Sequence, residues 1–251
     1  MASKTNNKVF VGMSGGVDSS VAAALLQQQG YDVTGVFIEV WQPDFMECSQ
    51  EEDRLDAMRV AAHLGIPFLT IDAVDAYKQK VVYYMIAEYR AGRTPNPDIM
   101  CNKWVKFGVF FEEARKRGAE FVATGHYSQI KNVKLKMQNN QHALLRGVDD
   151  NKDQSYFLWT LTQEHLRHTL FPIGEFEKSQ VREMAREFEL PTAEKKDSQG
   201  LCFLGKLDVR KFLSHFIEEK RGEVLNDSGE VIGHHEGATF FTLGQRHGFI
   251  V

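Results

Sequence analysis

A glycine turn between an apolar strand and a helix is the feature that most constrains this chain. Residues 8–13 (KVFVGM) predict a short buried strand, and residues 18–30 (DSSVAAALLQQQG) predict a helix that a glycine ends. Free N–H groups and hydroxyls at such a helix start favour a bound phosphate or pyrophosphate. The alternative is a simple helix cap made by Asp18 or Ser19. The candidate phosphate-binding residues are Gly12, Met13, Ser14, Gly15, Gly16, Val17, Asp18 and Ser19.

This loop lacks the lysine of the common phosphate loop, G-x-x-x-x-G-K-[ST], in which the lysine reaches the β- and γ-phosphates. Residues 200–207 (GLCFLGKL) match the first seven positions of that pattern. However, Leu207 stands where a serine or threonine must hold magnesium, and no strand precedes the match. We therefore interpret residues 200–207 as a chance match and residues 12–19 as a phosphate site of another kind.

The first half of the chain alternates between apolar strands and helices. We expect strands at residues 8–13, 32–38, 67–71 and 120–125, and helices at residues 18–30, 48–65, 73–91 and 103–118. This order predicts an α/β fold with an open, doubly wound parallel sheet and helices on both faces. In such sheets the ligand lies at the carboxyl ends of the strands, where residues 12–19 and 124–128 both fall.

The alternation stops after about residue 130. The sequence predicts a hairpin at residues 130–147 and helices at residues 179–191 and 210–222. A second hairpin is predicted around the turn at residues 227–229. A small β-rich domain therefore begins near residue 210.

The composition excludes several classes of protein. No apolar run approaches the roughly 20 residues that span a membrane, and the N-terminus has no signal-peptide pattern. Cys48, Cys101 and Cys202 lie far apart, which argues against a zinc site or a disulfide scaffold. We expect a cytoplasmic protein with no membrane contact. The net charge of -4 does not favour nucleic-acid binding, although a local basic patch is enough for it.

Several motifs resemble those of a known family. Residues 14–20 (SGGVDSS) are similar to the signature of the ATP-pyrophosphatases, or PP-loop enzymes, which split ATP between the α- and β-phosphates and adenylate a substrate oxygen. Five further blocks, in the family order, resemble those of the tRNA-specific 2-thiouridylases. These blocks are GRTPNPDIMCNKWVKF (92–107), ATGHYS (123–128), KDQSYFL (152–158), KKDSQGLCFLG (195–205) and TLGQRHG (242–248).

This resemblance implies a domain organisation. Residues 1–209 correspond to the catalytic domain, with an adenine nucleotide alpha hydrolase-like fold, and residues 210–251 correspond to part of the central domain. The family's C-terminal β-barrel is absent, and the chain ends inside the apolar stretch FTLGQRHGFIV. We therefore expect a truncated protein.

The resemblance also implies a reaction. ATP, with Mg²⁺, adenylates the C2 oxygen of the wobble uridine, position 34, in the anticodon stem-loop of a tRNA. Sulfur from a cysteine persulfide then replaces that oxygen and gives 2-thiouridine, AMP and pyrophosphate. The sulfur comes from a sulfur-relay protein or a cysteine desulfurase. The loop at residues 12–19 would hold the leaving pyrophosphate, so a lysine for the γ-phosphate is not needed.

Two cysteines are candidates for the sulfur chemistry. Cys101 is expected just before a helix, where the dipole favours a thiolate, and Asp98, three residues earlier, is a candidate proton acceptor or a residue that orients the base. From its neighbours alone, Cys101 is equally well a buried apolar cysteine, and Cys202 between Leu201 and Phe203 is better explained as a core residue. The resemblance makes Cys202 the persulfide carrier and Cys101 the nucleophile, which leaves a transient Cys101–Cys202 disulfide. Cys48 matches no motif.

The resemblance assigns further residues. Asn96, Pro97 and Asp98 correspond to the segment that contacts the target base, and Lys152, Asp153 and Gln154 to a tRNA-contacting segment. Gly125 and Ile38 correspond to nucleotide contacts, and His126 to a tRNA contact. The alternatives are a solvated charged turn at residues 152–154 and a structural hydrogen bond for His126. We expect no tightly bound metal or prosthetic group, because the adjacent pair His234-His235 would face opposite ways on a strand.

Two other functions fit part of the pattern. One is an ATP-pyrophosphatase that transfers nitrogen, which would not need the two cysteines. The other is a nucleotide-binding module without catalysis, because the barrel is absent. Exchange of pyrophosphate into ATP separates a catalyst from such a module.

Overall fold

A parallel sheet of five strands forms the centre of the molecule, with the strand order β3-β2-β1-β4-β7. The structure is a computed structural model, and it describes residues 7–45, 50–133, 141–197 and 208–251. The strands are β1 (Lys8–Gly12), β2 (Asp32–Glu39), β3 (Phe68–Asp72), β4 (Phe121–Ala123) and β7 (Thr169–Leu170). The open parallel sheet is as the sequence predicts. Strand β7 was not predicted, because two residues carry no periodic signal.

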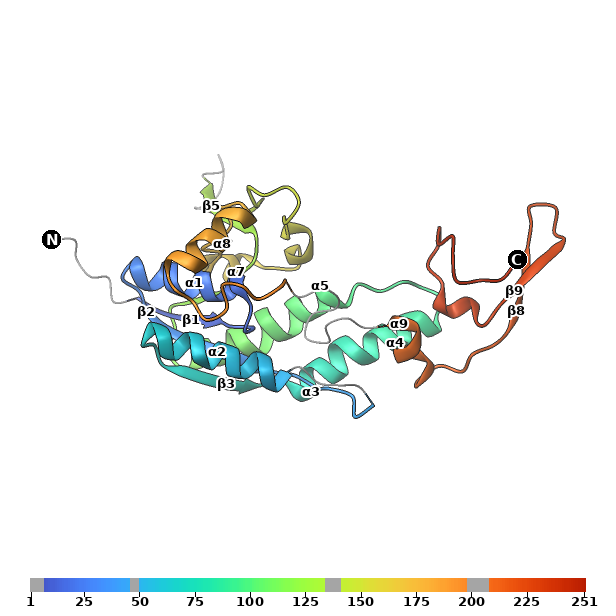
Figure 1. Ribbon diagram of the computed structural model, residues 1–251, viewed down its shortest axis with the longest axis horizontal. Helices are drawn as coiled ribbons and strands as arrows, with labels where there is room; N and C mark the ends of the chain where they lie inside the picture. The colour runs from blue at the N-terminus through green and yellow to red at the C-terminus, as the bar shows by residue number, and fades with distance from the viewer. Residues whose placement is uncertain (1–6, 46–49, 134–140, 198–207) are drawn as a thin grey trace.

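Helices cover both faces of this sheet (Figure 1). Val9 and Val11 of β1 lie in a buried cluster with residues of α1 (Val17–Gln28), α2 (Gln50–Leu64) and α8 (Lys178–Glu187). Phe10, which points to the other face, lies in the second cluster with the two long helices described next. The alternation of one strand between two cores is what a doubly wound sheet requires.

The two long helices each contain a widened, π-helical segment. The first consists of α3 (Val74–Tyr77), η1 (Lys78–Val82) and α4 (Tyr83–Arg90), within the predicted range. The second consists of α5 (Pro97–Cys101), η2 (Asn102–Phe110) and α6 (Phe111–Lys116). The prediction that this helix begins at residue 103 is wrong: the Asn96 side chain accepts a hydrogen bond from the Ile99 N–H, and Pro97 is the first helical residue.

The remaining elements are short. Strands β5 (Ser128–Val133) and β6 (Gln141–Arg146) pair antiparallel, and so do β8 (Gly222–Leu225) and β9 (Val231–His235), as predicted. The helix expected at residues 210–222 is the shorter α9 (Val209–Ser214). The other helical segments are η3 (Ser155–Leu158), α7 (Gln163–Arg167) and η4 (Ala238–Phe240).

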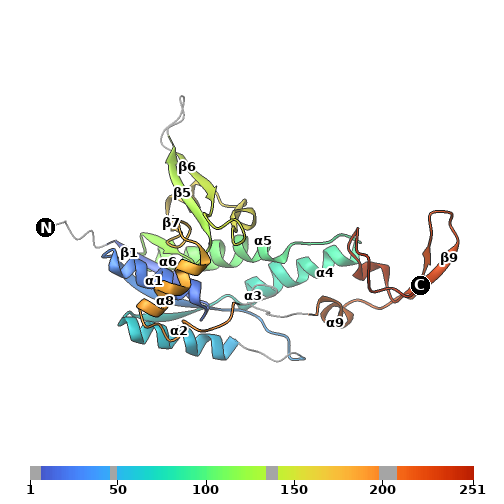
Figure 2. The same cartoon turned by 45° about the horizontal axis from the view of Figure 1, so that its top comes forward.

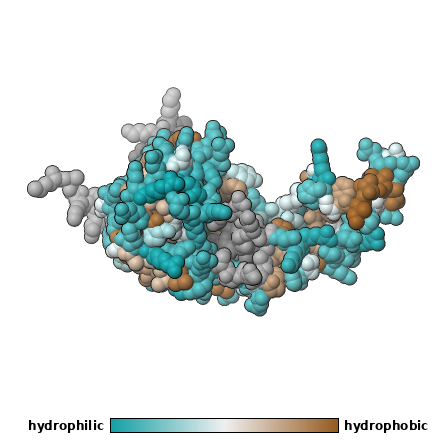
Figure 3. All heavy atoms as spheres, viewed as in Figure 1, coloured by the Kyte–Doolittle hydropathy of each residue, from teal (hydrophilic) through white to brown (hydrophobic). Residues whose placement is uncertain are grey.

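The molecule is elongated because α4 extends from the sheet towards the C-terminal elements (Figures 1 and 2). Phe212 and Leu213 of α9 are buried in the same cluster as Met85 and Ile86 of α4. By contrast, the β8–β9 hairpin exposes apolar side chains, and Figure 3 shows apolar surface at that end. The exposed side chains of the hairpin are Leu225, Val231 and Ile232, and Ile250 and Val251 are exposed beside them. Within the described ranges, we find no helix with the length and apolar character to span a bilayer.

Candidate active site

The loop between β1 and α1 forms one wall of the candidate site. Gly16 is the N-cap residue of α1 and no side chain caps this helix, so the structure does not show the alternative of a cap made by Asp18 or Ser19. Instead, the Ser14 N–H donates to the Ser19 hydroxyl at 3.2 Å, and the hydroxyls of Ser19 and Ser20 donate to the Gly16 carbonyl. The loop is closed by its own hydroxyl groups at the carboxyl end of β1.

Glycine is required at two points around this loop. Gly15 has a φ of +73°, and a Cβ there would lie 2.3 Å from the Asp53 carbonyl oxygen of α2. Gly125, after β4, approaches the start of α1 so closely that a Cβ would lie 2.7 Å from the Ser19 backbone nitrogen. Gly125, which the resemblance implies is a nucleotide contact, therefore lies directly against the start of α1.

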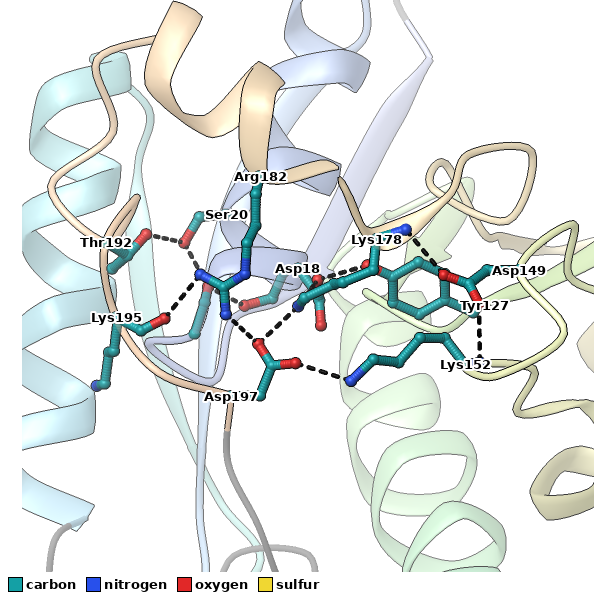
Figure 4. A network of polar contacts seen from close by, with 12 residues as sticks. Asp18, Ser20, Tyr127, Asp149, Lys152, Lys178, Arg182, Thr192, Lys195 and Asp197 are labelled. Carbon is teal, nitrogen blue, oxygen red and sulfur yellow. Dashed lines mark hydrogen bonds and ion pairs between the residues drawn. The ribbon is translucent and has the colours of Figure 1, made fainter. Parts of the chain in front are cut away.

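A cluster of charged residues lies beside the loop, and Figure 4 shows how they converge. Asp18, in the first turn of α1, accepts a hydrogen bond from the Tyr127 hydroxyl at 2.8 Å and pairs with the Lys178 ammonium at 2.7 Å. Lys178 also pairs with Asp197 at 2.9 Å. We call Asp18, Tyr127, Lys152, Lys178, Arg182 and Asp197 the Asp197 cluster.

Asp197 is bound by three cations. Lys152 pairs with it at 2.8 Å, Arg182 at 2.5 Å, and Lys178 completes the set. Partial burial raises the pKa of Asp197, but the hydrogen bonds from Lys152 and Lys178 outweigh it and lower that pKa to about 2. Burial and the neighbouring Asp18 carboxylate raise the pKa of the Tyr127 phenol, so Tyr127 remains a hydrogen-bond donor.

A second ion-pair group lies on the other side of the loop. The Lys195 ammonium bonds to Asp53 at 2.8 Å and to Asp56 at 2.7 Å, both on α2. The Thr192 hydroxyl donates to Ser20 of α1 at 3.1 Å. Residues 192–197 are thus tied to both helices that flank the loop.

The predicted tRNA-contacting segment at residues 152–154 is held by specific hydrogen bonds. Asp153 accepts from the Gly147 N–H and the Ser155 hydroxyl, both at 2.9 Å. The Gln154 side chain accepts from the Tyr127 N–H at 3.1 Å. Lys152 differs, because its ammonium reaches Asp197. The structure thus brings Lys152 into the Asp197 cluster beside the loop, whereas Asp153 and Gln154 anchor the segment to its neighbours.

Cys101 lies within the second long helix rather than before it. Its side chain is 0% exposed and packs in an apolar cluster with residues such as Val105 and Phe107. Asn96 and Pro97 form the start of this helix, and Asp98 lies in its first turn. The Asn96 side chain serves as the helix cap. The expected thiolate position before the helix is therefore corrected to a buried position inside it.

Two other predicted contacts are also buried. The His126 ring bonds to the Thr124 hydroxyl at 2.7 Å and lies near the rings of Phe107 and Phe171. This is the structural hydrogen bond that the sequence left as the alternative to a tRNA contact. Burial and the nearby Lys106 lower the pKa of His126, which keeps the ring neutral. Ile38 on β2 is packed in the core.

Cys202 and Cys48 lie outside the described residues, so the predicted Cys101–Cys202 pairing also lies outside them. Within the described ranges, no group of three or more His, Cys, Asp or Glu side chains has the arrangement of a metal site.

The sequence did not single out Lys178, Arg182 or Tyr127. A signal was available for two of them, because Lys178 and Arg182 are four residues apart and so share one face of α8. Their contact with the loop could not be predicted, because Lys178 is 160 positions from Asp18.

Comparison with known proteins identifies the family. A family model described as the tRNA methyl transferase HUP domain matches residues 7–206, and one described as the tRNA methyl transferase PRC-barrel domain matches residues 210–251. The tRNA-specific 2-thiouridylase MnmA of Listeria monocytogenes serotype 4a is 49% identical over 97% of this chain, which spans 66% of that protein. The protein of the same name from Francisella tularensis subsp. novicida is also 49% identical over 97% of this chain, and 67% of it is covered.

A solved structure supports the fold. The U34-tRNA thiolase NcsA from Methanococcus maripaludis has a TM-score of 0.50 and 16% identity, over 84% of this chain and 65% of that one. At this identity the likeness concerns the fold alone. The sequence relatives and the family models decide the assignment: the chain belongs to the family of the tRNA-specific 2-thiouridylases.

Proposed function

We propose that this chain carries the ATP-dependent 2-thiolation of the wobble uridine, position 34, in tRNA. The observation that carries the proposal is the loop at residues 12–19, a lysine-free phosphate loop at the carboxyl end of β1, in a chain 49% identical to 2-thiouridylases. MgATP is the first substrate, and the loop holds its departing pyrophosphate. The N–H groups at the start of α1 suit that anion.

Adenylation is the first chemical step. The uridine C2 oxygen attacks the α-phosphate of ATP, the bond between the α- and β-phosphates breaks, and pyrophosphate leaves with the electron pair. This step converts a poor leaving oxygen into AMP. The Asp18 carboxylate binds the Tyr127 hydroxyl and the Lys178 ammonium, so the Mg²⁺ that accompanies ATP would be held mainly by the phosphate oxygens.

Sulfur transfer is the second step. The terminal sulfur of a Cys202 persulfide attacks C2, and AMP leaves. The Cys101 thiolate attacks Cys202, the persulfide S–S bond breaks, and its electron pair stays on the sulfur now bound to C2. A Cys101–Cys202 disulfide results, and an external thiol reduces it for the next turnover. Since Cys101 is buried in the conformation described here, this step requires a rearrangement that exposes it.

The partners follow from this reaction. The tRNA presents its anticodon stem-loop, with Asn96, Pro97 and Asp98 next to the target base and Lys152 near the phosphates. A sulfur-relay protein or a cysteine desulfurase loads Cys202, and the cytoplasm is the site of the reaction.

Thiolation by the purified chain tests the proposal. The 251-residue chain is incubated with ATP, unmodified tRNA, a persulfide donor and a thiol reductant, and the digested tRNA is analysed by mass spectrometry for 2-thiouridine. We expect ATP-dependent 2-thiouridine with the wild type and none with Cys101→Ser or Cys202→Ser. Product formed equally well without ATP, or with Cys202→Ser, contradicts the proposed chemistry. If the chain exchanges pyrophosphate into ATP but never thiolates tRNA, it activates a substrate of another kind.

A further inference from the structure

The loop at residues 12–19 has no lysine of its own, but the fold brings one to it from a distant segment. Lys178 is the first residue of α8, and its ammonium bonds directly to Asp18 in the first turn of α1. Lys195 and Lys152 lie nearby, but their ammonium groups pair with Asp53 and Asp56 and with Asp197, respectively. Within the described residues, Lys178 is therefore the lysine whose ammonium bonds a side chain of this loop.

Packing fixes the position of this lysine. Val181 and Ala185 of α8 are buried in the same cluster as Val17 and Val21 of α1, so the two helices form one unit. The Lys178 N–H donates to the Asp149 carboxylate at 2.9 Å, which holds the first turn of α8. The Lys178 side chain is 12% exposed, and its ammonium lies 5.9 Å from the centre of the Tyr127 ring. An ammonium that is already held in place loses little further rotamer entropy when it binds an anion.

The charges around Asp197 indicate what that anion is. Three cations, Lys152, Lys178 and Arg182, converge on this one carboxylate (Figure 4). With Asp18, which also pairs with Lys178, these three cations share two carboxylates, so the cluster has one more positive than negative side chain. A pyrophosphate group carries several charged oxygens that each accept such bonds. Lys178 bonds both to Asp197 and to Asp18 of the loop, so its ammonium lies between this group of cations and the loop.

We propose that Lys178 is a pyrophosphate-binding residue of the ATP site, and that Asp197 competes with the pyrophosphate group for its ammonium. The inference rests on the proposed function for its ligand, ATP. It assigns to α8 the role that a lysine within the loop plays in the common phosphate loop. The two carboxylates have different roles: Asp18 holds the ammonium beside the loop, and Asp197 exchanges with phosphate.

Binding measurements on a charge-removing variant test the first part. Isothermal titration calorimetry compares wild type, Lys178→Met and Lys178→Arg with pyrophosphate, ATP and AMP. Because a hydrogen bond to a charged group contributes about 1.5–3 kcal/mol, Lys178→Met should weaken pyrophosphate and ATP binding by about 10- to 100-fold. AMP binding should change less than about twofold, and Lys178→Arg should retain part of the affinity.

Arg186→Met is the matched control, because Arg186 lies on the same helix and pairs with Glu194 at 2.8 Å, away from the loop. Thermal unfolding shows whether each variant is folded. Wild-type pyrophosphate affinity in Lys178→Met overturns the proposal. An equal loss of AMP binding also overturns it, since the effect would then be a general disturbance of the site.

The sign of the effect at Asp197 tests the second part. If Asp197 competes for the ammonium, Asp197→Asn should tighten pyrophosphate binding by about threefold or more, a coupling typical of contacting residues. In Lys178→Met/Asp197→Asn this gain should shrink or vanish. Weaker binding in Asp197→Asn would show that the carboxylate supports the site instead of competing with the ligand.

These measurements separate this inference from the proposed function. A wild-type chain that binds neither ATP nor pyrophosphate contradicts both. A chain that binds ATP equally well with and without Lys178 contradicts the inference alone. A chain whose ATP affinity depends on Lys178, but which never thiolates tRNA, supports the inference and contradicts the proposed thiolation.

Discussion

The Asp197 cluster and the surroundings of Cys101 differ in the forces that hold them. The cluster consists of partly exposed ion pairs between segments far apart in the sequence, such as Lys178 and Asp18. Cys101 is enclosed by apolar side chains of one core. Ion pairs of the first kind contribute little to stability and exchange partners readily, whereas apolar packing resists change. We therefore expect the loop at residues 12–19 and the Asp197 cluster to bind ATP without a large rearrangement. The core around Cys101 must rearrange before its thiol can react.

Cys101→Ser should give the largest difference between the two regions, because it should abolish sulfur transfer and leave ATP binding intact. If Cys101 releases the sulfur, its loss should lower 2-thiouridine formation by at least about 10³-fold, because a nucleophile has no substitute in the site. ATP affinity should remain within about twofold, since the phosphate loop is not altered. Single-turnover thiolation and calorimetry on the same preparation measure the two effects. Thiolation at wild-type rate would leave Cys101 as a core residue only.

The pair Gly15→Ala and Gly16→Val separates folding from binding within the loop. Gly15→Ala should lower the free energy of unfolding by about 2–4 kcal/mol, because its φ is positive and its Cβ would meet the Asp53 carbonyl oxygen. Gly16 has a φ of -95°, which valine adopts, so Gly16→Val should fold normally but bind ATP at least about 10-fold more weakly, because the side chain enters the phosphate space. Urea unfolding and calorimetry check both. Unchanged ATP affinity in Gly16→Val would make the loop structural.

The buried His126 ring tests the apolar region through the pH dependence of stability. Burial, with a smaller contribution from Lys106, lowers the pKa of His126 well below 6.5 in the folded protein. The unfolded chain therefore binds the extra proton, and stability falls as the pH drops below about 6.5. At pH 5.5 the loss should be about 1 kcal/mol. His126→Asn should remove this part of the pH dependence between 6.5 and 5.5, as measured by urea unfolding. Equal slopes in both proteins would count against a buried, neutral ring.

The ion pairs of Asp197 should make the smallest contribution to the free energy of unfolding. Its pKa is lowered to about 2, so the native ion pairs contribute their stability above about pH 4 and lose it as the pH falls through about 2. Because the cluster is partly exposed, the contribution should be below about 1 kcal/mol. The stability difference between wild type and Asp197→Asn should disappear between pH 4 and pH 2. A difference that persists at pH 2 would have another origin than this carboxylate.

Local patterns predicted much of the fold, because four strands and the main helices each have a recognisable spacing of apolar residues. Strand β7 was missed, since Thr169 and Leu170 are too few for a pattern. The early start of the second long helix could have been predicted from Asn96 and Pro97, which are typical capping and first-turn residues. The burial of Cys101 follows from that helix.

In the candidate site, too, only the features with a local sequence pattern could be predicted. The loop at residues 12–19 was visible in the sequence because its residues are contiguous. The Asp197 cluster was not visible, because Asp18, Lys178 and Asp197 meet only through the packing of α1 against α8. The resemblance to a family indicated single residues such as Lys152, but it did not indicate their ion-pair partners.

The π-helical segment at Asn102–Phe110 has a consequence for movement along its helix. A π-helical turn holds more residues than a regular α-helical turn. The same helix can in principle place this wide turn at a different position. If the wide turn moves along the helix, each residue that it passes rotates by about 100° about the helix axis, while both helix ends keep their places. Cys101 is the residue immediately before this segment. Passage of the wide turn across Cys101 would thus change the direction of its thiol within the core without unravelling the helix.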